Sequence, residues 1–232
     1  MNAKRMLQKV VGVSVLVTVL FSTVVGAAYA APAAATTLSA DEIAGLIFMR
    51  EEEKLAHDVY VTFYQEYGLS IFNNIAGSEL SHMAAVKTLL DGYGIADPAA
   101  GNGVGEFENA DLQALYDQLI VQGSQSLSAA LKAGATIEEI DIRDLQTRLT
   151  ATTPADITQV YTNLLYGSYN HLRAFTRTLT SQTGEVYQPH YLDAATYQSI
   201  IAGSNGQRGG TSGMSNSTGQ RSSLGRSGSR NW

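Results

Sequence analysis

Cysteine is absent from the sequence, and this absence limits the kinds of site that the chain can carry. Without thiols there is no disulfide framework, no zinc finger and no thiolate catalysis. Any metal must therefore be held by oxygen and imidazole ligands.

Acidic residues are absent from both ends of the chain, although the whole chain has a formal charge of −6. Residues 1–30 and 203–232 hold seven of the 15 basic residues and none of the 21 acidic ones. The segment between them therefore has eight basic and 21 acidic residues, a net charge of −13. So acidic a domain attracts cations and excludes nucleic acid as an expected partner.

The first 30 residues have the three parts of a secretory signal peptide. In order, these are Lys4, Arg5 and Lys9, an almost uninterrupted apolar run of 16 residues over 10–25, and the tripeptide Ala28-Tyr29-Ala30. We expect cleavage after Ala30, followed by a linker over 31–38, and a secreted, periplasmic or cell-envelope location. An uncleaved membrane anchor is the alternative, although a spanning helix needs ~20 apolar residues.

The last 30 residues lack the apolar side chains that a folded segment needs. Sixteen of residues 203–232 are Gly or Ser, which predicts a disordered tail. Its basic residues suggest loose contact with anionic envelope polymers, and a simple solvated appendage is the alternative. They are Arg208, Arg221, Arg226 and Arg230.

Between these ends the sequence shows no convincing strand and no solenoid repeat. Apolar residues recur every three or four positions, so residues 39–202 predict one helical domain. We expect helices over 39–67, capped by Ser39 and Glu42, over 70–93, capped by Ser70, over about 109–149, and onward from Thr153-Pro154. Within the third, Gly123 and Gly134 are expected to be kinks or close-packing points.

The connections between the predicted helices differ in length. About fifteen irregular, glycine-rich residues over 94–108 separate the second helix from the third, whereas the other turns are short. A loop of that length can cross a bundle. The fold expected is therefore all-α, a ferritin-like four-helix bundle with a long crossover between helices two and three.

Each predicted helix places an ionisable residue among its apolar core positions. These residues are Glu53, Glu79, His82, Glu138 and His171. Glu79 and His82 form a Glu-x-x-His pair, which puts a carboxylate and an imidazole on one face about one turn apart. Their order along the chain nearly matches the di-iron carboxylate pattern of four-helix bundles, so we expect a metal site. A buried ion-pair network, or side chains that face water, are the alternatives.

Four segments resemble a known family. They read REEEKLA at 50–56, SELSHM at 78–83, IEEIDI at 137–142 and GSYNHLRAF at 167–175. Together they are similar to the ferritin-like proteins of domain-of-unknown-function family 2202, over about residues 41–201. The first two helices are more distantly similar to rubrerythrin-type proteins. The resemblance implies a ferritin-like bundle with a dinuclear metal site, but no known reaction.

One position departs from the full di-iron pattern. Three residues before His171, where that pattern has Glu, this chain has Ser168, a much poorer ligand. Asp141 and Glu139 are additional candidate ligands that would compensate, and a single ion or a vestigial site is the alternative. Glu51 and Glu52 adjoin Glu53, and only the apolar period selects Glu53. Tyrosines such as Tyr60, and also His57, are candidate hydrogen-bond partners of the ligands, with ordinary packing as the alternative for each.

These patterns predict an exported protein that binds iron or manganese, as one ion or two. If it is an enzyme, the reaction expected is oxidation of ferrous iron, or reduction of oxygen or peroxide. The alternative is a non-catalytic helical module that binds an envelope component and retains a vestigial or structural site. A homo-oligomer, including a storage cage, stays open because nothing in the sequence addresses assembly.

Overall fold

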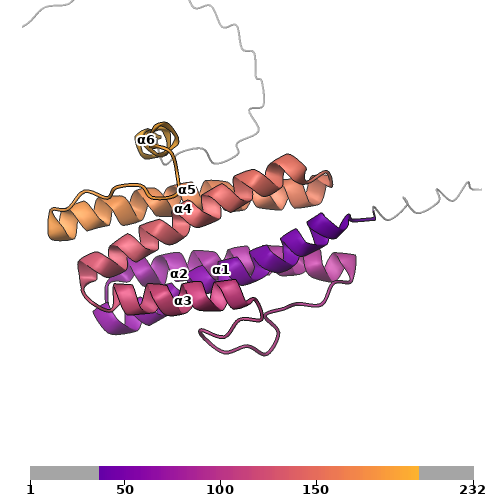
Figure 1. Cartoon of the computed structure of the whole chain (residues 1–232), viewed down its shortest axis with the longest axis horizontal. Helices are drawn as coiled ribbons and strands as arrows, with labels where there is room; N and C mark the ends of the chain where they lie inside the picture. The colour runs from indigo at the N-terminus through magenta and orange to yellow at the C-terminus, as the bar shows by residue number, and fades with distance from the viewer. Residues whose placement is uncertain (1–36, 204–232) are drawn as a thin grey trace, which may run out of the picture. The chain divides into compact units, whose positions relative to one another are not determined.

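The computed structural model describes residues 37–203, which form six α-helices and no strand (Figure 1). The predicted signal peptide and most of the predicted linker and tail lie outside these residues. Within residues 37–203, no helix has the length and apolarity needed to cross a membrane. The helices are α1 (Ala40–Tyr67), α2 (Ser70–Tyr93), α3 (Ala110–Gly123), α4 (Leu127–Ala151), α5 (Ala155–Thr183) and α6 (Ala194–Ala202). The predicted all-α class is confirmed.

The first two helices begin in different ways. α1 has the predicted capping box, in which the Ser39 hydroxyl accepts the Glu42 amide and the Glu42 carboxylate accepts the Ser39 amide. The prediction that Ser70 caps α2 was wrong, because Ser70 is the first helical residue and Leu69 precedes it without a side-chain cap. Leu69 packs on the core, so burial rather than a hydrogen bond fixes this helix start.

The predicted single helix over 109–149 was also wrong, because the chain forms α3 and α4 with a break at residues 124–126. The Ser126 hydroxyl accepts the Ala129 amide at 3.1 Å and starts a new helix there. Gly123 ends α3 against Phe63, where an added Cβ would lie 2.0 Å from the ring. Gly134 likewise packs against Phe175, so both glycines are close-packing points.

The bundle consists of two helix pairs that pack against each other. α1 lies along α2, α4 lies along α5, and the pairs meet where α1 contacts α4 and α2 contacts α5 (Figure 1). The loop over 94–109 and α3, which packs on α1 and α4, together form the long connection from α2 to α4. α6 was not predicted, and it packs on the outside of α5.

The core is divided into two apolar clusters by a polar layer. One cluster includes Tyr60, Phe72 and Phe175, and the other includes Met49 and Leu164. Along α1, α2 and α5 the residues between the two clusters carry charged and polar side chains. Such groups are costly to bury without partners, so this layer is where function is to be sought.

Candidate metal centre

All five predicted ligand residues lie in the polar layer, so the helix phases read from the sequence are confirmed. α1 supplies Glu53, α2 supplies Glu79 and His82, α4 supplies Glu138 and α5 supplies His171. Four of them are buried, and the His82 side chain is 14% exposed. Their role as metal ligands stays a prediction, since the geometry shows only that they converge.

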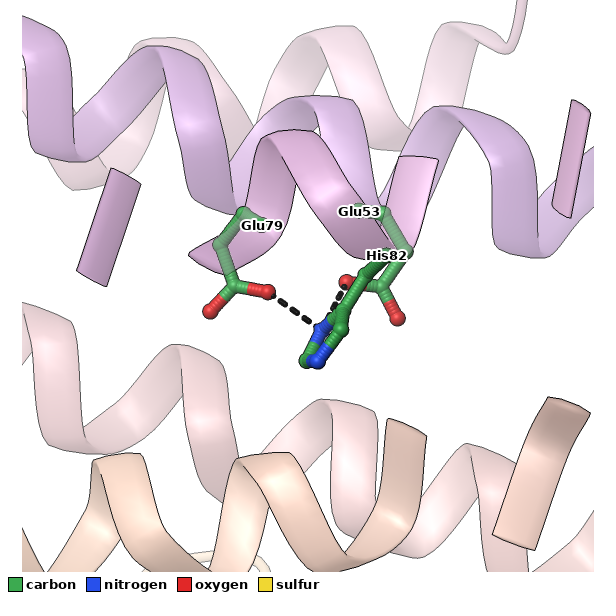
Figure 2. A group of neighbouring side chains, drawn as sticks. All are labelled: Glu53, Glu79 and His82. Atoms are coloured by element: carbon green, nitrogen blue, oxygen red, sulfur yellow. Dashed lines mark hydrogen bonds and ion pairs between the residues drawn. The ribbon is translucent and has the colours of Figure 1, made fainter. Parts of the chain in front are cut away.

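The first group of converging side chains is Glu53, Glu79 and His82. Figure 2 shows the three pointing from α1 and α2 toward the opposite helix pair. The His82 Nδ1 atom lies 2.7 Å from Oε2 of Glu79 and 3.2 Å from Oε2 of Glu53. The Glu-x-x-His spacing therefore brings a carboxylate and an imidazole together within one helical turn. Glu53 on α1 adds a second carboxylate to the same imidazole.

The second group is Glu79, Glu138 and His171. The His171 Nδ1 atom lies 2.7 Å from Oε1 of Glu79 and 3.5 Å from Oε2 of Glu138. In both groups the ligand atoms lie within 4.8 Å of one another, a spacing that can hold a metal ion. Glu79 belongs to both, with one carboxylate oxygen toward each imidazole.

Several atoms of the two groups have no hydrogen-bond partner among the described residues. They are Oε1 of Glu53, Oε1 of Glu79 and Nδ1 of His171. The last two are 2.7 Å apart, yet they do not form a hydrogen bond of acceptable geometry. Buried polar atoms are rarely left in this state, and a cation shared by these atoms would give them a partner.

The carboxylates and imidazoles perturb each other's protonation. Burial raises the pKa of Glu53 to about 8, although His82 opposes the shift. Burial would lower the pKa values of His82 and His171, but the nearby carboxylates raise them to about 11 and about 10. Burial alone would raise the pKa of Glu79, but the two imidazoles hold it below its usual range. Protons thus neutralise this layer when no cation is bound.

Two hydrogen bonds and one glycine position the candidate ligands from outside. The Tyr60 hydroxyl donates to Oε1 of Glu138 at 2.5 Å, as the sequence suggested for a tyrosine near a ligand. Nε2 of His171 lies 3.0 Å from the Ser78 hydroxyl, which leaves Nδ1 facing the carboxylates. Gly167 makes room for His82, because an added Cβ would lie 2.6 Å from its ring.

Comparison with known proteins identifies the family. The model of the uncharacterized protein domain DUF2202 matches residues 42–204, well over half of the chain. The chain belongs to the DUF2202 family. The uncharacterized protein MJ0754 of Methanocaldococcus jannaschii is 48% identical over 167 residues, which cover 72% of this chain and 90% of MJ0754. The crystal structure of the hypothetical protein MJ0754 from Methanococcus jannaschii superposes with a TM-score of 0.72 at 46% identity, and covers 76% of this chain and 100% of the crystallised one.

In this DUF2202 chain, Ser168 and Asp141 lie together beside the two groups. The Ser168 hydroxyl donates to Oδ2 of Asp141, while Oδ1 of Asp141 has no partner among the described residues. Burial, and next the charge of Glu53, raise the pKa of Asp141 well above its usual range. A carboxylate from α4 is therefore present near the place where the di-iron pattern has a carboxylate from α5.

The other additional candidate, Glu139, is not part of the centre. Its carboxylate accepts hydrogen bonds from the Tyr187 hydroxyl at 2.8 Å and the His190 amide at 2.9 Å, with Tyr191 and Leu192 amides at 3.4 and 3.3 Å. The neighbouring Glu138 points the other way because successive helix residues are about 100° apart. His57 also lies elsewhere, with Nδ1 2.8 Å from Asp58.

The acidic run 51–53 of this DUF2202 protein divides into three environments. Glu51 accepts the Glu108 amide at 2.6 Å and the Asn109 amide at 3.2 Å, and so anchors the end of the crossover loop. Glu53 belongs to the centre. Glu52, which the apolar period did not select, is 3% exposed and both its carboxylate oxygens lack a partner among the described residues. Burial, and next the charge of Asp141, raise its pKa well above the usual range.

Proposed function

We propose that this chain is an exported, ferritin-like protein that binds two divalent metal ions, iron or manganese, in the polar layer of its bundle. The observation that carries the proposal is that Glu79 belongs to two ligand groups at once, each completed by one imidazole and one further carboxylate. Glu79 would then be a ligand of both ions, and a two-ion site of this kind would supply Lewis-acid or redox chemistry.

The donor set supports these metals. It contains oxygen and imidazole nitrogen and no sulfur, a combination that suits iron and manganese. With Asp141 included, the buried carboxylates of the centre are Glu53, Glu79, Glu138 and Asp141, whose four negative charges, when all are ionised, would balance two divalent cations. Two ions would thus remove the electrostatic cost that this layer imposes on the metal-free fold.

An oxidoreductase is the activity we propose for such a centre, with ferrous iron, oxygen or peroxide as the reactant. Bound iron or manganese would supply the one-electron chemistry that none of the side chains can perform. The chain's own contribution is to orient the ligands through Tyr60 and Ser78 and to keep bulk water out with the two apolar clusters.

Elemental analysis of the purified protein tests metal binding. We expect two ions per chain in the wild type and none in the double variant Glu79→Gln/His82→Ala. Glu66→Gln/His57→Ala is the matched control, because it removes the same two side-chain types from positions on α1 outside the centre. Retention of two ions by the first variant would contradict the site.

The alternative function is a non-catalytic helical module with a vestigial site, and Ser168 in place of a carboxylate favours it. Protein loaded anaerobically with ferrous iron and then exposed to air distinguishes the two. An oxidase should develop the near-ultraviolet absorption of carboxylate-bound ferric iron faster than free iron oxidises, and the Glu79→Gln/His82→Ala variant should not. An unchanged rate of oxidation would favour the module.

A further inference from the structure

Glu52 is a buried acid that the proposed centre does not use. It is 3% exposed, and both of its carboxylate oxygens lack a hydrogen-bond partner among the described residues. Its neighbour Glu51 is held by two backbone amides and its neighbour Glu53 faces His82. Such a carboxylate is costly to bury, and the charged groups that act on it are two further carboxylates against one guanidinium, so a cation would be stabilised there.

The groups that face Glu52 come from one side of α4. Asp141, Asp144 and Arg148 follow at spacings of three and four, so they share one helix face, and all three interact electrostatically with Glu52. Asp141 has an unpartnered oxygen of its own and lies next to Glu53. Asp144 is 23% exposed and its carboxylate is 3.0 Å from Arg143, an exposed residue. Partly exposed Asp144 and buried Asp141 thus both act on Glu52, and Asp141 also acts on Glu53 of the centre.

We propose that divalent cations enter the metal centre along this row of carboxylates between α1 and α4, with Glu52 as the transit ligand. The inference rests on the proposed function, because it needs a centre to load. A row of acidic oxygens replaces part of the hydration shell of a cation at each step, which allows an ion to pass through a dry interior.

Arg148 explains why the row would pass ions on rather than hold them. Its guanidinium stacks on Phe48 at 4.6 Å and adds a positive charge beside Glu52. Transit sites have to bind ions weakly enough to release them.

Loading of the metal-free full chain with Co²⁺, followed by stopped-flow visible absorption, tests the route. We expect Glu52→Gln to slow loading about tenfold and Asp144→Asn about threefold, with the final number of bound ions unchanged. Asp117→Asn is the control, because it removes one exposed acidic charge from α3, away from the route, and should load at the wild-type rate.

The outcomes separate this inference from the proposed function. If the wild type binds two ions and Glu52→Gln loads at the same rate, entry runs elsewhere, for example past His82, and only the route is wrong. If Glu52→Gln binds fewer ions at equilibrium, Glu52 is a ligand of the centre and the transit role is wrong. If the wild type binds no Co²⁺, both proposals fail. Should Glu52→Gln fold poorly, the partly exposed Asp144→Asn decides alone, and a wild-type loading rate in that variant overturns the route.

Discussion

Glu138 and Glu139 are adjacent, equally buried and chemically identical, yet they lie in opposite environments. Glu139 accepts hydrogen bonds from the segment that follows α5, and neither of its oxygens lacks a partner. Glu138 faces His171 and receives one hydrogen bond, from Tyr60. Saturation with hydrogen bonds therefore distinguishes a buried acid that holds the fold together from one that is available to a cation.

Glu51 and Glu53 repeat the contrast on α1. Glu51 is bound by the amides at the end of the crossover loop, whereas Glu53 has an unpartnered oxygen beside His82. Because burial is the same on both sides of the comparison, burial by itself does not indicate which acid is open to a cation. The partners do.

The largest effect is expected from Glu139→Gln. The amide group of Gln would face the donors of Tyr187 and His190, so we expect a loss of about 2–4 kcal/mol in the free energy of unfolding. Urea denaturation of the metal-free protein measures this, and metal stoichiometry should be unchanged. A loss below about 1 kcal/mol would contradict the structural role of Glu139.

Metal addition should have the next largest effect. Ions that bind only the folded state stabilise it by about 2.7 kcal/mol at 100 times the dissociation constant. The thermal unfolding temperature should therefore rise with Mn²⁺ and fall again with a chelator. In Glu79→Gln/His82→Ala the shift should vanish, and an equal shift in that variant would mean that the ions bind elsewhere.

Gly167→Ala tests whether the space beside His82 matters to the centre. The new methyl group would lie 2.6 Å from the imidazole and displace it. We expect metal affinity to fall about tenfold, measured by competition with a chromophoric chelator. Gly77→Ala on α2 has no atom within 4 Å of the added methyl group and should leave the affinity unchanged.

Glu138→Gln should have a small effect on the metal-free protein. Burial raises the pKa of Glu138, so its uncharged form resembles Gln, and the Gln oxygen still accepts from Tyr60. We expect the free energy of unfolding to stay within about 1 kcal/mol of the wild type or to rise, while bound metal falls. A loss as large as that of Glu139→Gln would remove the distinction between the two acids.

Glu42→Gln should have the smallest effect, at a carboxylate that is hydrogen-bonded but only partly buried. The amides of Ser39 and Thr153 lower the Glu42 pKa from 4.5 to about 2. A carboxylate whose pKa is lowered by folding stabilises the fold at pH values above its ordinary pKa. This contribution to the free energy of unfolding is lost as the pH falls from 4.5 toward about 2. The urea midpoints of wild type and variant should therefore converge over that range, and a constant gap would contradict this origin.

Much of the centre could be predicted from the sequence because helical periodicity fixes which residues share a face. The spacing of Glu79 and His82, and their apolar neighbours, was sufficient to place them inside. The break at Ser126 was missed since apolar residues continue in phase across it. Glu52 was missed for the opposite reason, because no apolar period includes it, although it is 3% exposed in the fold.

The sequence alone determined the all-α class, the helices α1, α2 and α5, the inward phase of the five candidate ligand residues and the absence of thiolate from any site. These follow from local spacing and composition, which need no knowledge of distant contacts. Only the tertiary structure decided that Glu79 faces both imidazoles, that Asp141 meets Ser168 and that Glu139 binds the segment after α5. Those outcomes depend on how the helices pack against each other, and the residue spacing within one helix does not specify where the neighbouring helices lie.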